Sequence, residues 1–86
     1  MTKLELMKIE KETLKIADTI VFPTPYENDL WNLVSKPIVV YGISKYGSRK
    51  IDRAIERIAK YYGVDEMRVC EDNERQTQWF RDTYKI

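Results

Sequence analysis

The sequence predicts a small α/β domain, a three-stranded and mostly parallel sheet with flanking helices in the order α-β-α-β-α-β-α. Segments with helical periodicity alternate along the chain with short apolar runs rich in β-branched residues. Such alternation is typical of parallel strands joined by right-handed crossovers. The alternative is an α+β fold in which the first short strand pairs antiparallel at an edge of the sheet.

Composition limits the class of protein. The chain has 86 residues, which suits one small globular domain over residues 1–86. It is 43% hydrophobic and 34% charged, and no apolar run approaches the roughly 18 residues that span a bilayer. Charges recur every two or three positions from Met1 to Asp18, which leaves no room for the apolar centre of a signal peptide. We therefore expect a soluble cytoplasmic protein with no membrane partner.

The chain contains no histidine. It therefore has no imidazole for a Ser-His-Asp or Cys-His nucleophile, and no nitrogen ligand for zinc. The single cysteine, Cys70, stands in an apolar run and is interpreted as a small core residue. A non-enzymatic protein is favoured, with no cofactor, no metal site and no catalytic residue.

The first predicted helix begins with a capping box formed by Thr2 and Glu5. One face of this helix collects its apolar positions, namely Leu6, Ile9, Thr13, Ile16 and Ala17. The run "TIVF", residues 19–22, then reads as a buried strand that Pro23 ends.

A short helix should follow, with Thr24 as its cap, Pro25 in the first helical position and Glu27 completing a second capping box. It should run to about Val34, and its buried side chains should be Leu30, Trp31 and Val34. The continuous apolar run "PIVVYGI", residues 37–43, is typical of a central strand covered on both faces.

The best-defined element is a helix from about Ser48 to Gly63, where Val64 is placed for the hydrophobic contact of a Schellman motif. Its apolar side should consist of Ile51, Ala54, Ile55, Ile58, Ala59, Tyr61 and Tyr62. The run "EMRVC", residues 66–70, reads as the third strand. A last helix, capped by Asn73 and Gln76, should carry Trp79, Phe80, Thr83 and Tyr84.

One segment bears a short resemblance to a known class. The letters "AIERIAKYYGVD", residues 54–65, resemble the last helices of repressor-type DNA-binding domains over about a dozen residues. The resemblance implies DNA binding, although no helix-turn-helix is predicted upstream.

In a parallel sheet, ligands bind beyond the carboxyl ends of the strands. Three loops should converge there, at residues 23–26, 44–49 and 71–73. The second loop is bracketed by Gly42 and Gly47 and leads into a helix N-terminus, which favours an anion. Its letters share the glycine spacing of a P-loop but place Ser48 where the phosphate-binding lysine belongs, so nucleotide hydrolysis is not expected. An ordinary structural turn is the alternative.

Positive charge is concentrated in one segment. Formal charges sum to about −2 over residues 1–35, about +5 over residues 36–64 and about −2 over residues 65–86. On the helix from Ser48, five cations fall within about 100° of one another: Arg49, Lys50, Arg53, Arg57 and Lys60. An anionic partner would offset their repulsion, whereas Asp52 and a pair between Glu56 and Lys60 would make this an ordinary solvated face.

These observations predict a small non-enzymatic module that captures a phosphate-bearing ligand, either a nucleotide or nucleic acid. The predicted contacts are Ser44, Lys45, Tyr46, Gly47, Ser48, Arg49, Arg53, Arg57 and Tyr26. The alternative is a small interaction protein of the phage or mobile-element type, an inhibitor or adaptor whose basic helix docks on an acidic surface of a larger protein.

Overall fold

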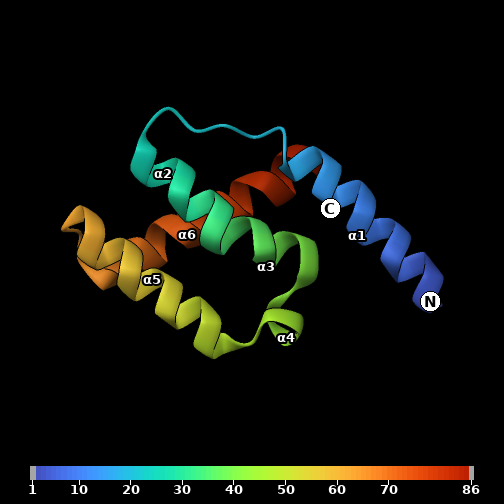
Figure 1. Ribbon diagram of the computed structural model, residues 1–86. Coiled ribbons are helices and arrows are strands. Elements are labelled where there is room, and N and C mark those ends of the chain that lie inside the picture. The colour runs from blue at the N-terminus through green and yellow to red at the C-terminus, as the bar shows by residue number, and fades with distance from the viewer. Residues whose placement is uncertain (1, 86) are drawn as a thin grey trace.

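The protein is all-helical in the computed structural model, which describes residues 2–85 (Figure 1). A π-helical turn, η1, continues α2 into α3, so α2, η1 and α3 form one rod through the middle of the molecule. The elements are α1 (Lys3–Ala17), α2 (Pro25–Leu30), η1 (Trp31–Ser35), α3 (Lys36–Tyr41), α4 (Ile43–Tyr46), α5 (Ser48–Tyr62) and α6 (Glu66–Tyr84).

The predicted α/β class is wrong, because residues 2–85 contain no strand and no sheet. Residues 19–22 form an irregular connection, residues 37–41 belong to α3, and residues 66–70 are the first turns of α6. Short apolar runs do not distinguish a strand from a buried helical segment. Because residues 37–41 and 66–70 are helical, residues 19–22 have no strand with which to form backbone hydrogen bonds.

The central rod shows how a β-like sequence becomes helical. Pro37 has no N–H, and its ring would collide with the carbonyl of Leu33 in a regular helix. The turn before it is widened, and the Lys36 amide donates to the Trp31 carbonyl five residues back. The helix therefore passes the proline and continues to Tyr41.

α5 agrees with the prediction. Gly63 adopts the left-handed conformation with φ of 64°, and the Val64 amide donates to the Ala59 carbonyl at 2.9 Å, as in a Schellman motif. Four side chains of its predicted apolar face are buried, namely Ile51, Ile55, Ile58 and Ala59. Tyr61, which was expected on that face, is 80% exposed.

α6 begins earlier than predicted. Asp65 is its N-cap, and the carboxylate accepts a hydrogen bond from the Met67 amide at 2.8 Å. Asn73 and Gln76, expected to cap a later helix, therefore lie in the middle of α6. Phe80 is fully buried as expected, whereas Trp79 is 43% exposed and Cys70 is exposed rather than part of the core.

Two hydrophobic clusters hold the helices together. The first lies between the central rod, α5 and α6, and contains Leu30, Val34, Ile51, Ile55, Ile58, Ala59 and Val69. The second joins α1 to α3, η1 and α6, and contains Ala17, Trp31, Val40 and Phe80. The predicted burial of Leu30, Trp31 and Val34 is confirmed. Because Leu30 and Val34 lie in the first cluster and Trp31 in the second, the rod connects the two parts of the core.

A buried polar contact fixes α6 against the rod. The Ser35 hydroxyl lies 2.7 Å from Gln76 Oε1 and 2.8 Å from Asn73 Oδ1. Gln76 Nε2 donates to the Glu27 carbonyl at 2.8 Å. Among residues 2–85 no buried side-chain nitrogen or oxygen is left without a partner, so these polar groups are buried at little cost.

Candidate functional site

The two glycines of the predicted anion loop are helix breaks. Gly42 and Gly47 have φ of 78° and 80°, a conformation that side-chain-bearing residues rarely adopt. They isolate the short helix α4 and turn the chain from α3 into α5. Their positions therefore follow from the path of the chain, and no strand precedes them as a P-loop requires.

The side chains of this segment are exposed but partly engaged. Lys45 Nζ forms an ion pair with Glu10 of α1 at 3.1 Å and lies 4.9 Å from the centre of the Tyr41 ring. The Tyr46 ring packs on Tyr41 at 5.5 Å between ring centres. Lys45 and Tyr46 thus attach α4 to its neighbours. The other predicted contacts of the segment, Ser44, Gly47, Ser48 and Arg49, are exposed.

The predicted cationic surface is present on α5, and we call it the basic face. It consists of Arg49, Lys50, Arg53, Arg57 and Lys60, all of which are exposed. None of the five forms an ion pair with an acidic side chain of residues 2–85, and the expected pair between Glu56 and Lys60 is not made. No direct ion pair within the part of the chain that the structure describes therefore offsets their mutual repulsion.

An apolar border runs along one side of the basic face, and it consists of Leu33, Ala54 and Tyr61. Leu33 projects from the widened turn η1 and is 58% exposed, and Tyr61 is 80% exposed. The Tyr61 ring packs edge-on against Tyr62, with 4.8 Å between the ring centres. Large apolar groups are thus held open to solvent beside the cations.

Two hollows lie along this border and share Leu33 and Arg57. One, of about 550 Å³, is largely apolar and is lined by Asp29, Leu33, Arg57, Ile58, Lys60, Tyr61 and Tyr62. The other, of about 290 Å³, is lined by Leu33, Lys50, Arg53, Ala54 and Arg57. Leu33 and Arg57 line both hollows, and we call the two neighbouring hollows together the groove between η1 and α5.

The end of this groove is fixed by a hydrogen bond between two helices. The Tyr62 hydroxyl of α5 donates to the Asp29 carboxylate of α2. That hydrogen bond, with desolvation of the phenol, raises the pKa of Tyr62 to about 12, because ionisation would place a phenolate beside Asp29. Asp29 is thereby engaged in a hydrogen bond between α2 and α5, while the cations of the groove have no ion-pair partners in residues 2–85.

Tyr26 lies at the opposite end of α5 from the predicted contacts at residues 44–49. Its ring packs on Tyr62 at 5.5 Å, which is about 20 Å along the helix from Ser48 at 1.5 Å per residue. The hydroxyl donates to Asp72 of α6 at 2.8 Å. The predicted convergence of three loops beyond a sheet is therefore wrong: Tyr26 meets Asp72 in the middle of α6, and residues 44–49 do not join them.

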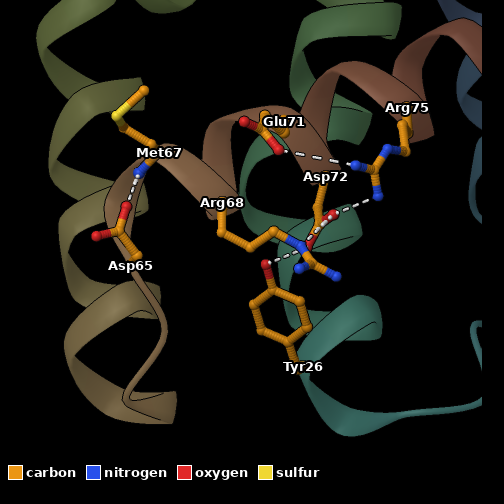
Figure 2. A network of polar contacts seen from close by, with 7 residues as sticks. All are labelled: Tyr26, Asp65, Met67, Arg68, Glu71, Asp72 and Arg75. Carbon is orange, nitrogen blue, oxygen red and sulfur yellow. Dashed lines mark hydrogen bonds and ion pairs between the residues drawn. The ribbon is translucent and has the colours of Figure 1, made fainter.

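Figure 2 shows the polar network around Tyr26. Arg68 Nε and Arg75 Nη1 reach the Asp72 carboxylate at 3.2 and 3.0 Å from either side. Burial, and then the hydrogen bond to Asp72, raise the pKa of Tyr26. These groups line a hollow of about 690 Å³ with Phe22 and Trp79. Its cations are paired with acidic side chains, unlike those of the basic face.

α5 and α6 are joined by residues 63–65 alone, a helix-turn-helix arrangement with Gly63 in the turn. The repressor-like segment, residues 54–65, therefore consists of the second half of α5 and the turn that leads into α6. In DNA-binding units the second helix enters the major groove with its N-terminal residues. Here that helix begins at Asp65 and Glu66 and exposes Glu71 and Glu74 beside Arg68 and Arg75, so carboxylates outnumber cations on its first turns, which disfavours phosphate binding.

Sequence reasoning missed three features of this region: exposed Leu33, exposed Tyr61 and the pairing of Tyr26 with Asp72. The exposure of Leu33 could have been predicted, because Leu30 and Val34 already occupy the buried side of the same helix. The exposure of Tyr61 and the partner of Tyr26 depend on how α5 and α6 pack, which no local pattern encodes.

Further observations bear on the class of protein. Residues 2–85 contain no cluster of three Cys, Asp or Glu side chains that could hold a metal ion. In the same range no helix has the length and apolar character needed to cross a bilayer. Comparison with protein-family models, curated proteins and solved structures finds no match for this chain.

Proposed function

We propose that this protein is a non-enzymatic binding module that captures an anionic partner on the basic face of α5. The observation that carries the proposal is the absence of ion pairs from all five cations in residues 2–85. Neighbouring like charges on a helix cost about 0.2–0.5 kcal/mol per pair, and a bound anion would remove this cost and steer association.

A phosphate-bearing partner, nucleotide or nucleic acid, is the first candidate. Its support is the row of exposed cations that begins at the N-terminus of α5, where Arg49 follows Ser48 and Gly47. Phosphate groups of a nucleic-acid backbone would contact such a row without reading base sequence.

An acidic protein surface is the second candidate. It is favoured by Leu33 and Tyr61, because exposed apolar side chains beside cations suit a protein partner and contribute nothing to phosphate binding. The acidic start of α6, which adjoins α5, also opposes a close approach by a nucleic acid.

The test is capture from native lysate, with and without nuclease, by the wild-type chain and by Arg53→Glu/Arg57→Glu. We expect the wild type to retain a partner that is released by salt, since charge complementarity is screened at high ionic strength. The double reversal should lose the partner. Sensitivity to nuclease would assign it to the first candidate, and a stoichiometric protein to the second.

A matched control is Lys8→Glu/Lys11→Glu on α1, which changes the net charge equally at two exposed positions away from α5. This variant should retain the partner. Both variants should unfold within about 1 kcal/mol of the wild type, because they alter exposed side chains only. Retention of the partner by all three chains, or in high salt, would contradict the proposal.

A further inference from the structure

We propose that the groove between η1 and α5 is a docking site for an acidic amphipathic helix of a partner protein. This inference rests on the proposed function and specifies its partner. It is argued from the shape, the charge and the apolar content of the groove.

The groove has the dimensions of a helix-binding site. Its lining residues on α5 extend from Lys50 to Tyr62, a length of about 18 Å at 1.5 Å per residue. A partner helix of about three turns would match this length, and its apolar side chains at positions i, i+3, i+4 and i+7 would contact one line of residues. The two hollows, about 550 and 290 Å³, would receive those side chains.

The charges around the groove indicate that its partner carries negative charge. Four cations line it, namely Lys50, Arg53, Arg57 and Lys60. The one acidic group, Asp29, accepts the hydrogen bond of Tyr62 and is held against α5. A partner that carries carboxylates on both sides of its apolar stripe would pair with these cations.

The apolar content separates a helix from a nucleic acid. Leu33 is 58% exposed at the point where the two hollows meet, and Tyr61 is 80% exposed at one end. A phosphate backbone has no apolar group to cover Leu33, whereas a leucine or phenylalanine of a partner helix does. Dependence of binding on Leu33 is therefore the decisive property.

The experiment is a selection from displayed random peptides of about 16 residues, roughly four helical turns, on the immobilised wild-type chain. The enriched peptides are then synthesised, and their affinities are measured by fluorescence anisotropy for the wild type, Leu33→Asn, Tyr61→Ser and Arg53→Glu/Arg57→Glu. Circular dichroism of each free chain verifies the fold, and that of each complex reports peptide helicity. A DNA duplex and a single-stranded RNA of about 20 nucleotides are measured in parallel.

We expect enriched peptides with acidic residues around an apolar stripe of helical spacing, and a gain of helicity on binding. Leu33→Asn, which changes no charge, should weaken binding about tenfold, or by about 1.4 kcal/mol. The arginine reversal should weaken it at least as much, and Tyr61→Ser should weaken it less, since Tyr61 lies at the end of the groove.

Two other results would overturn the inference in distinguishable ways. Binding of peptides or nucleic acids that needs Arg53 and Arg57 but is unchanged in Leu33→Asn would exclude the helix groove and leave the basic face as the functional surface. If nothing that binds depends on Arg53 and Arg57, both the groove and the proposed function are wrong.

Discussion

Single side-chain hydrogen bonds between helices decide much of the local geometry. The Tyr62 hydroxyl reaches Asp29, the Tyr26 hydroxyl reaches Asp72, and the Trp31 Nε1 donates to the Ala17 carbonyl at 3.1 Å. Each bond joins helices that are distant in sequence. The aromatic residues of this small chain therefore serve packing and orientation together.

The pKa of Tyr62 gives a prediction at alkaline pH. Because the folded state raises this pKa from 10.0 to about 12, the stabilising bond is fully present below pH 10 and is lost as pH rises toward 12. In this interval the unfolded chain releases its proton first, so the free energy of unfolding falls with pH. Tyr62→Phe should make that fall shallower in urea unfolding measured from pH 9 to 12, and an unchanged slope would contradict the assignment.

At the scale of single elements, α5 is the helix that joins the core to the proposed binding surface. One side contributes Ile51, Ile55 and Ile58 to the core, and the opposite side carries the basic face. Its Schellman end at Gly63 and its break at Gly47 define its length independently of any partner. A ligand of the proposed site would therefore contact a helix whose ends are set by the chain itself.

Substitutions at the adjacent residues Ile58 and Arg57 test whether α5 has one buried side and one exposed side. Ile58 is 3% exposed, so Ile58→Ala should lower the free energy of unfolding by about 2–5 kcal/mol through lost burial and a cavity. Arg57→Ala, at an exposed position, should change it by no more than about 0.5 kcal/mol. Urea unfolding measures both, and an Ile58→Ala chain as stable as the wild type would show that another face of α5 is buried.

At the scale of the whole molecule, packing is uneven. The first half of α1 projects away from the other helices (Figure 1), and Leu4, Leu6, Met7 and Ile9 are between 44% and 78% exposed. Only from Thr13 to Ala17 does this helix enter the core. The apolar face predicted for residues 6–17 is thus buried in its second half alone.

This asymmetry predicts the order of hydrogen exchange. Amides of residues 6–10 in α1 should exchange faster than those of residues 55–59 in α5, because local opening of the projecting turns exposes little buried surface. Exchange followed by mass spectrometry or NMR measures the difference. Equal protection of the two segments would indicate that the start of α1 is covered in solution.

Some of the fold could be predicted because local interactions determine it. The caps at Thr2 and Thr24, the left-handed Gly63 and the apolar face of α5 depend on residues within one or two turns, and each is found. At the second cap the Glu27 carboxylate accepts from the Thr24 hydroxyl, a variation on the expected capping box. The cationic side chains of α5 were likewise placed on one face by helical spacing alone.

The tertiary structure decided what local patterns left open. Residues 37–41 are rich in β-branched residues, but they become helical because Val40 continues the buried stripe of Trp31 and Val34. Residues 66–70 become helical because Val69 shares the buried side of α6 with Phe80. The sequence alone determined that the chain lacks histidine, that α5 is a helix and that one side of α5 is positively charged. Packing determined that Leu33 lies beside that charge and that Tyr26 lies away from residues 44–49, since both positions depend on contacts between helices distant in sequence.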